Sequence, residues 1–314
     1  MVNGIAPTVT ESADELAGKF AAARPFRHVI VDDFFEPGLC AELVEQFPRF
    51  DRGHSLNESG RPGKKSTIQE VRSIGAAYRR VDQIIRSVDF LRLIATITGI
   101  GEPLYDPDYV GGGTHETLPG GELDPHVDFN YHPRTRLHRR LNLIVFLNPR
   151  WESEWGGCLE LLSDPWDRDP QRIVPVANRA VLFETTESSW HGFDLVNPPE
   201  GLDISRRSFA IYFYSKARPA TQMTASHGTF YYQRQLPEHI RSGRTLSEED
   251  AREIQRLIDR RDHQIRFLYE RELRFSKLIE GITNSASFRV GRAFTWPIRM
   301  LRGKSAKADP VRRN

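Results

Sequence analysis

The chain has 314 residues, of which 39% are apolar and 27% charged, so it can bury one large core and carry an appendage. Its formal net charge of +2 gives no overall nucleic-acid signature, and no nucleic-acid partner is expected. Cys40 and Cys158 are too few for a disulfide framework or a structural zinc site. The sequence shows no signal-peptide pattern and no run near the roughly 18 apolar residues of a membrane span, which favours a cytoplasmic location.

The N-terminal part of the chain is predicted to be mainly helical. Residues 1–24 form a polar N-terminal segment within which residues 14–22 predict a short helix, and residues 29–31 are β-branched and predict a strand. Pro37 then opens a helix with an apolar face, and residues 74–97 carry apolar positions at helical spacing. Between these helices, residues 50–67 are polar and rich in Gly and Lys. They are interpreted as a long mobile connection, with a lid over a site as the alternative.

From Leu104 to Lys216 the pattern changes to short β-rich runs separated by Gly, Pro, Asn and Asp. Several short strands at such spacing predict a sandwich or a barrel. The predicted strands are residues 113–118, 123–129, 141–147, 158–162, 173–176, 180–184 and 208–214.

Candidate metal ligands lie within this β-rich region. His126 and Asp128 are two residues apart, so on a strand both side chains would lie on one face. His191, several strands later, can supply a third ligand. Two imidazoles and one carboxylate form a facial triad with open positions, which is typical of non-haem Fe(II) oxygenases. Arg206 begins a further strand, and its guanidinium can bind a dicarboxylate end-on through two parallel hydrogen bonds.

Taken in order, these motifs resemble the 2-oxoglutarate/Fe(II)-dependent oxygenases of the prolyl 4-hydroxylase-like type. The resemblance runs from about Pro25 to Lys216. Its landmarks are residues 25–34, Pro119-Gly120-Gly121, His126-Val127-Asp128, residues 140–148, residues 156–161, His191 and Arg206-x-Ser208. The fold it implies is mainly β with flanking helices: a double-stranded β-helix, or jelly roll, buttressed by N-terminal helices and followed by a long C-terminal helix.

The resemblance implies that His126, Asp128 and His191 are the catalytic metal ligands. They would hold Fe(II), with 2-oxoglutarate as co-substrate and O₂ in the remaining positions. Halogenating relatives lack the carboxylate ligand, so Asp128 favours hydroxylation. Arg206 would bind the distal carboxylate of 2-oxoglutarate, with Ser208 on the same strand face. A strand slipped by one residue would give this role to Arg207 instead.

One position departs from the family pattern. Relatives often carry a tyrosine, whose phenol touches the same carboxylate, where this chain has Phe146. A phenyl ring donates no hydrogen bond. Asn142, on the same strand face, is expected to replace the donor, or else Thr117 or His115 on a neighbouring strand. The alternative for Asn142 is a buried amide bound to backbone.

The activity implied is hydroxylation of an unactivated C–H bond, coupled to conversion of 2-oxoglutarate to succinate and CO₂. The preferred substrate hypothesis is a sugar or glycoconjugate in cell-surface polysaccharide biosynthesis, and a prolyl, peptidyl or amino-acid substrate is the alternative. A non-catalytic metal-binding jelly-roll module and a zinc hydrolase are rivals from other classes. An arginine-rich loop after Asp128 would suit an anionic substrate, or is simply solvated. Its arginines are Arg134, Arg136, Arg139 and Arg140.

The chain is therefore divided into a polar segment 1–24, an oxygenase domain 25–218, a linker 219–245, a long helix 246–283 and a basic aromatic tail 284–314. The helix has a seven-residue apolar step, which fits either a self-pairing coiled coil, and so a homo-oligomer, or a helix folded back on the barrel. The tail looks like C-terminal segments of bacterial cell-surface polysaccharide enzymes. It could lie at the inner face of an anionic membrane, with a solvated disordered tail as the alternative.

Overall fold

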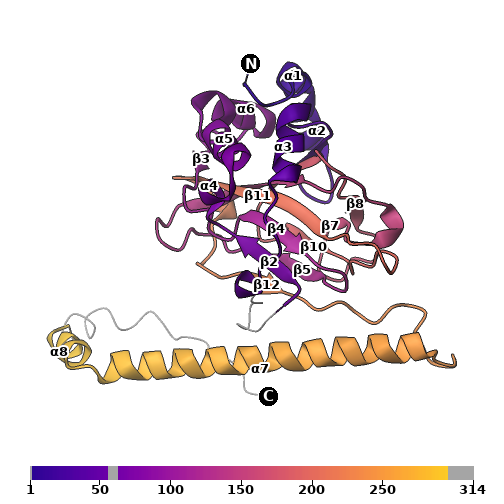
Figure 1. Cartoon of the computed structure of the whole chain (residues 1–314). Coiled ribbons are helices and arrows are strands. Elements are labelled where there is room, and N and C mark those ends of the chain that lie inside the picture. The colour runs from indigo at the N-terminus through magenta and orange to yellow at the C-terminus, as the bar shows by residue number, and fades with distance from the viewer. Residues whose placement is uncertain (1, 56–62, 296–314) are drawn as a thin grey trace. The chain divides into compact units, whose positions relative to one another are not determined.

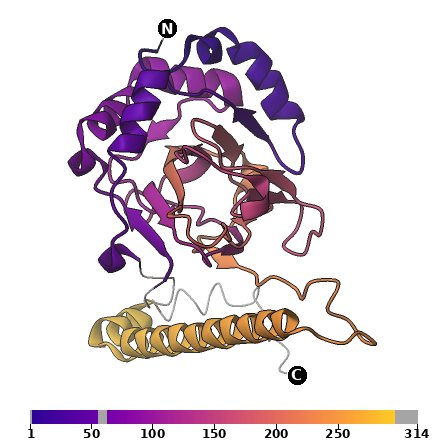
Figure 2. The same ribbon diagram turned by 45° about the vertical axis from the view of Figure 1, so that its right-hand side comes forward.

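Two antiparallel sheets enclose a common interior, as Figure 2 shows. The larger sheet has the order β1-β9-β6-β11-β4-β2, with β3 also pairing with β11, and the smaller has the order β12-β5-β10-β7-β8. Strands of the larger sheet are β1 (His28–Val31), β2 (Lys65–Ile68), β3 (Leu104–Tyr105), β4 (Gly113–Thr117), β6 (His138–Phe146), β9 (Ala180–Glu184) and β11 (Arg206–Ser215). Those of the smaller are β5 (Leu123–Val127), β7 (Leu159–Leu162), β8 (Gln171–Ile173), β10 (Trp190–Phe193) and β12 (Phe230–Tyr231). These two antiparallel sheets, with their flanking helices, confirm the predicted jelly-roll fold.

The central strands of the larger sheet are apolar along most of their length because both of their faces are covered. On β6, Leu143 packs in the cluster shared with the N-terminal helices, whereas Phe146 packs in the interior cluster with Leu161 of the smaller sheet. On β11, Phe209 belongs to the helix-facing cluster. Because side chains alternate along a strand, Arg206, three residues earlier, belongs to the interior face. This alternation decides which polar residues reach the space between the sheets.

Within residues 2–55 and 63–103, six helices precede the β-rich region and cover one face of the larger sheet (Figure 1). They are α1 (Pro7–Glu11), α2 (Ala13–Ala22), α3 (Pro37–Glu45), α4 (Val71–Ile74), α5 (Ala76–Ile85) and α6 (Val88–Thr98). Residues 74–97 are thus several helices, because Ser87 starts a new one: its hydroxyl accepts from the backbone N–H of Phe90 at 3.2 Å. The expected polar segment 1–24 instead packs into the core, since Leu16 and Phe20 of α2 are buried.

The structure, a computed structural model, describes residues 2–55 and 63–295. The connection expected over 50–67 is therefore described only in part. Its described residues include the 3₁₀ turn η1 (Arg52–His54), and its end is not a loop, because β2 pairs with β4 from Lys65 onward. The expected linker 219–245 likewise contains a 3₁₀ turn, η3 (Ala220–Gln222), and the strand β12, which joins the smaller sheet.

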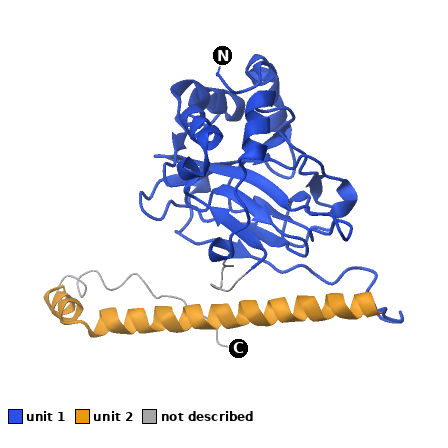
Figure 3. Ribbon diagram, viewed as in Figure 1, with its two compact units in different colours: residues 1–247 blue, residues 248–314 orange. Residues whose placement is uncertain are grey.

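The chain divides into two units, residues 1–247 and 248–314, coloured separately in Figure 3. The second unit contains α7 (Glu248–Asn284), the predicted long helix, and α8 (Ala286–Phe294). Apolar side chains at the seven-residue step are exposed along α7: Ile258, Ile265, Leu268, Phe275, Ile279 and Ile282. Within the described residues, none of the helices is long and apolar enough to cross a bilayer.

Candidate metal centre

His126, Asp128 and His191 meet between the two sheets. His126 lies on β5 and His191 on β10, and these neighbouring strands place the two residues directly opposite each other. Their ring centroids are 4.1 Å apart. Asp128 follows β5 immediately, and one potential ligand atom from each of the three residues lies within 4.8 Å of the others. Two imidazoles and one carboxylate thus converge from one side, as a facial metal site requires.

Both histidines present an unprotonated Nε2 to this space. The Nδ1–H of His126 donates to the Asp124 carbonyl at 3.0 Å, and that of His191 donates to the Ser189 carbonyl at 2.9 Å. These bonds select the tautomer with a lone pair on Nε2. Burial lowers the pKa of both imidazoles, that of His126 to about 3, so both are neutral at pH 7. The donor set therefore fits a divalent metal ion.

The Asp128 carboxylate is held by two side chains from β6. Its Oδ2 accepts from Arg139 Nη2 at 2.9 Å and from Asn142 Nδ2 at 2.8 Å. Burial alone would raise the pKa of Asp128, but Arg139, the two histidines and Asn142 together lower it, so the group stays ionised. Asn142 Oδ1 in turn accepts from Arg139 Nε at 3.1 Å and Nη2 at 2.9 Å. The three side chains form a closed polar cluster beside the metal ligands.

Asn142 therefore differs from its expected role. It was expected to donate to 2-oxoglutarate in place of the phenol that Phe146 lacks. Instead its amide bridges Arg139 and Asp128, because those two charged partners lie within reach of its oxygen and nitrogen. Phe146 is fully buried, and its ring lies 5.1 Å from the guanidinium carbon of Arg206.

Arg206 is a buried cation on the interior face of β11. Its Nε donates to the Gly157 carbonyl at 2.6 Å, and its guanidinium carbon lies 4.1 Å from the ring centroid of Phe193. Across residues 2–55 and 63–295, no carboxylate forms an ion pair with it. Burial lowers its pKa to about 10, so it remains charged at pH 7. Thr117 of β4 pairs with Arg206, and both Thr117 and Ser208 are buried beside the arginine.

Arg207 points to the opposite face of the same strand. Its Nε donates to Glu116 Oε1 at 3.1 Å, and its guanidinium lies 5.3 Å from the Phe47 ring on the helix-covered side. The register of β11 thus gives Arg206, not Arg207, access to the interior. His115 pairs with Ser208, but its Nε2 is within 3.2 Å of the Gly111 carbonyl, so backbone already engages that nitrogen.

The four arginines of the predicted loop after Asp128 each have a protein partner. Arg134 pairs with Asp108 at 2.7 Å, Arg136 lies 5.1 Å from the Tyr131 ring, and Arg139 pairs with Asp128 as described. Arg140 pairs with Glu184 at 3.3 Å. The case for an anionic substrate loses this support, because three of the four charges are neutralised by carboxylates.

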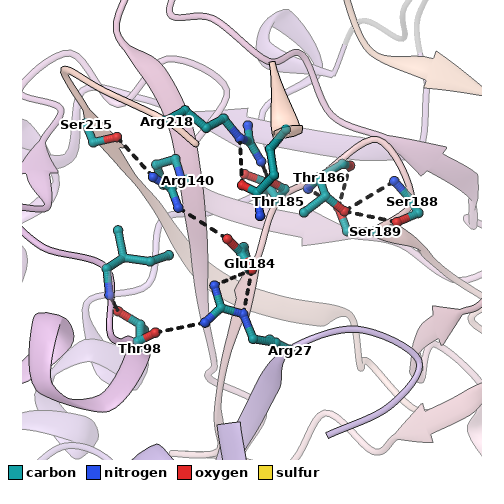
Figure 4. A network of polar contacts seen from close by, with 12 residues as sticks. Arg27, Thr98, Arg140, Glu184, Thr185, Thr186, Ser188, Ser189, Ser215 and Arg218 are labelled. Atoms are coloured by element: carbon teal, nitrogen blue, oxygen red, sulfur yellow. Dashed lines mark hydrogen bonds and ion pairs between the residues drawn. The ribbon is translucent and has the colours of Figure 1, made fainter. Parts of the chain in front are cut away.

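Figure 4 shows the network around Glu184. Arg27 and Arg140 bind its two carboxylate oxygens, and the next residue, Thr185, is held through its carbonyl by Arg218. The chain then turns, with the Ser189 hydroxyl donating to the Thr186 carbonyl at 2.9 Å. Since the Ser189 carbonyl holds His191, this network steadies the turn that positions one metal ligand.

A second cluster, Asp106, Asp108 and His132, also brings possible ligand atoms together. Here the histidine Nδ1 accepts from two backbone N–H groups, those of Arg134 at 3.2 Å and Thr135 at 3.1 Å. The proton therefore sits on Nε2, which faces Asp106 Oδ1 at 3.5 Å. A protonated nitrogen is no metal ligand, so this cluster is an internal polar contact.

Sequence reasoning missed two residues of the first site. The sequence pattern puts Arg139 in a loop, and its distance from Asn142 along the chain gives no sign that both contact Asp128. The same pattern puts Tyr231 in a linker, yet its ring stacks on that of His126 with centroids 5.1 Å apart. Its signal is weak, since β12 has only two residues.

Comparisons with known proteins agree with this geometry. Residues 112–214 match the family model described as 2OG-Fe(II) oxygenase superfamily. The chain is 35% identical over 89 residues to prolyl 3-hydroxylase OGFOD1 of Mus musculus. The aligned segment covers 26% of this chain but only 16% of that protein.

Among solved structures, a Trichoplax adhaerens prolyl hydroxylase complexed with a peptide fragment of hypoxia-inducible factor aligns at 16% identity and a TM-score of 0.46, over 67% of this chain and 94% of that one. A Pseudomonas putida prolyl-4-hydroxylase aligns at 20% identity and a TM-score of 0.42, over 64% and 98% respectively. The resemblance predicted from the motifs is confirmed by the family match, which places residues 112–214 of this chain among sequences similar to the 2OG-Fe(II) oxygenase superfamily.

Proposed function

We propose that this protein is an Fe(II)- and 2-oxoglutarate-dependent dioxygenase that hydroxylates an unactivated C–H bond. The observation that carries the proposal is the pairing of a neutral two-histidine, one-carboxylate cluster with a buried arginine, Arg206, that has no carboxylate partner in the described parts of the chain. When bound, Fe(II) with 2-oxoglutarate and O₂ supplies the oxidising chemistry. A non-catalytic module or a zinc hydrolase would not need a buried arginine placed to bind a dicarboxylate.

The protein's own residues bind and orient. His126, Asp128 and His191 would hold the metal from one side and leave its other positions open. Arg206 would receive the distal carboxylate of 2-oxoglutarate as a bidentate, charge-assisted pair, with Ser208 and Thr117 beside it. The Phe146 and Phe193 rings pack on the guanidinium, which is buried.

The direct test is optical. Anaerobic protein with Fe(II) and 2-oxoglutarate is expected to develop the weak visible metal-to-ligand charge-transfer band of this family, and to release succinate when O₂ is admitted. Fe(II) without the co-substrate is the control. Absence of the band at saturating concentrations would favour the binding-module or zinc-hydrolase rivals.

Substitution of single ligands tests the metal assignment. His126→Ala, Asp128→Ala and His191→Ala are each expected to weaken Fe(II) binding by about tenfold or more, because each removes one of three donors. Isothermal titration under anaerobic conditions measures the effect. Normal Fe(II) affinity together with normal succinate release in His191→Ala would exclude the triad.

For the substrate we propose a sugar or glycoconjugate of cell-surface polysaccharide, on the strength of the basic aromatic tail at 284–314. A prolyl or peptidyl substrate is the second candidate, favoured by the match to the mouse prolyl 3-hydroxylase. Succinate release across nucleotide sugars, lipid-linked saccharides, free amino acids and prolyl peptides separates the two. Stimulation by peptides alone would reject the sugar proposal.

Assembly and location follow from the second unit. We propose that the exposed apolar stripe of α7 pairs with a second copy of the chain, because these side chains recur at coiled-coil spacing. We also propose a cytoplasmic protein whose tail contacts an anionic membrane face: α8 carries exposed Phe288 and Phe294 together with Arg289 and Arg292. The remainder of the tail, including Trp296, lies outside the described residues.

A further inference from the structure

The segment that follows the family match contacts the metal centre directly. The match ends at residue 214, and residues 224–234, called the strap below, run along the smaller sheet. Within the strap, β12 pairs with β5, the strand that carries His126. The ladder extends one residue further, since the Tyr232 N–H donates to the Pro125 carbonyl at 2.8 Å.

The register of β12 places Tyr231 opposite His126. Residues directly opposite in an antiparallel pair project from the same face, so Tyr231 lies on the interior face with the ligand histidines. Tyr231, His126, His191 and Leu161 form one continuous row across four strands. Tyr231 ends this row on the side away from Leu161.

Ring contacts run along the same row. The Tyr231 and His126 rings stack at 5.1 Å with an interplanar angle of 28°, within the range of favourable aromatic contacts. On the other side of the pair, Phe183 of β9 packs against His191 at 4.8 Å. The imidazole of His126 therefore contacts the Tyr231 ring, and that of His191 contacts the Phe183 ring. Phe183 comes from the matched domain, whereas Tyr231 comes from the strap.

Polar contacts anchor the strap close to the metal ligands. The Asn130 side chain donates to the Ala225 carbonyl at 2.8 Å and accepts from the His227 N–H at 3.0 Å. Glu187, in the β9–β10 turn, accepts from the Thr224 hydroxyl at 2.7 Å and pairs with His227 Nε2 at 2.9 Å. At the far end, Arg234 pairs with Glu160 at 2.7 Å. These contacts fix the strap at both ends of β12.

We propose that Tyr231 is a positioning residue for the metal ligand His126, held in place by the strap. The ring of His126 has one fixing contact at Nδ1, its bond to Asp124, which still permits tilting about that bond. The stacked Tyr231 ring restricts the tilt and so aims Nε2 at the metal position. The proposal rests on the proposed function only in assuming that His126 binds a metal ion.

The test compares substitutions in the full chain, with Co(II) as the probe metal. Tyr231→Leu keeps an apolar side chain but removes the ring, and it is expected to weaken Co(II) binding by about tenfold and to change the visible Co(II) spectrum. Tyr231→Phe keeps the ring and should restore both affinity and spectrum. Phe230→Leu is the matched control, because the Phe230 ring stacks on His227 rather than on a ligand.

Unchanged Co(II) affinity and spectrum in Tyr231→Leu would overturn the proposal, as would an equal loss in Phe230→Leu. The unfolding midpoint of the metal-free variants shows whether each is folded. If Tyr231→Leu does not fold, Glu187→Gln provides the second test, since it loosens an anchor without touching the ring. It is then expected to shift the Co(II) spectrum in a folded protein, and an unshifted spectrum would reject the role. Failure of the wild-type protein to bind Co(II) would instead contradict the proposed function.

Discussion

Asp128 has two differently engaged oxygens. Oδ2 accepts from Arg139 and Asn142 and lies 3.4 Å from His191 Nε2, whereas Oδ1 faces His126 Nε2 at 3.8 Å. Each oxygen thus lies beside one ligand imidazole, and Oδ2 is in addition held by two side-chain donors. The guanidinium of Arg139 is itself fixed between aromatic rings, 3.5 Å from the Tyr212 centroid and 4.4 Å from that of Phe129. This packing gives the contact a rigid geometry.

Asn142→Leu tests the contribution of this support. It removes one hydrogen bond from Asp128 and two from Arg139, so we expect Fe(II) affinity to fall by about tenfold while the fold is kept. Arg136→Ala, in the preceding loop, removes a cation without touching Asp128 and should leave the affinity unchanged. Titration of both variants with Fe(II) under anaerobic conditions measures the two affinities. Equal behaviour of the two would show that Asn142 does not orient Asp128.

At the scale of elements, a β-bulge decides which β6 side chains face the metal. Asn142 pairs with Tyr212 of β11 and Leu141 with Phe213, but Tyr214 pairs with Arg139, so the register shifts by one residue at Arg140. Strict alternation would put Arg139 and Asn142 on opposite faces, since they are three residues apart. The extra residue reverses this and brings both to Asp128. Arg140 turns instead to Glu184.

The register of β11 gives a second prediction. Arg206→Ala should raise the concentration of 2-oxoglutarate needed for turnover, with little change in Fe(II) affinity, because the clamp is lost but the metal ligands remain. Losing one buried bidentate pair costs on the order of 2–4 kcal/mol. Arg207→Ala is the control, since Arg207 pairs with Glu116 on the other face. Steady-state succinate release measures this concentration for both variants. If Arg207→Ala raised it and Arg206→Ala did not, the observed register would be contradicted.

The whole molecule combines a metal-binding domain with a unit that the proposed catalysis does not need. The two units are separate in their internal contacts, and the apolar stripe along α7 is exposed. The N-terminal helices, by contrast, are part of the domain's core, as buried Phe20 and Leu39 show. Function is thus expected to tolerate changes at the C-terminal end but not at the N-terminal end.

Truncation after about Ile282 should leave the fold and uncoupled 2-oxoglutarate turnover intact, because it removes only α8 and the basic tail. Binding to anionic liposomes should be lost, since each basic residue near such a surface contributes about 1 kcal/mol. Co-sedimentation with liposomes at increasing salt measures this, and binding by the full chain should weaken as charges are screened. Full-length protein that ignores anionic liposomes at low ionic strength would remove the membrane proposal.

The stability of the metal-free protein should fall in mild acid. Burial lowers the pKa of His28 and holds that of His115 well below its ordinary value, so both imidazoles bind a proton less readily in the native state than in the unfolded chain. The unfolded chain takes up these protons below about pH 6.5, and the free energy of unfolding therefore falls as the pH drops through that value. Urea unfolding at about pH 7.5 and about pH 5.5 measures the difference. His28→Gln should reduce it, whereas a slope equal to that of the wild type would contradict this assignment.

The sequence by itself determined the resemblance to the 2OG-Fe(II) oxygenases, the jelly-roll class and the candidate triad, because these depend on local information: the His-x-Asp spacing, alternating apolar strands and the order of the motifs. Tertiary structure decided the rest. Arg139 reaches Asp128 only because of a bulge set by pairing with β11, and Tyr231 reaches His126 only because β12 adds to the smaller sheet. Residues 1–24 are predicted to be a polar segment, yet apolar side chains such as Leu16 and Phe20 pack into a core built from distant residues. Such contacts depend on pairing between remote strands, which spacing along one segment does not encode.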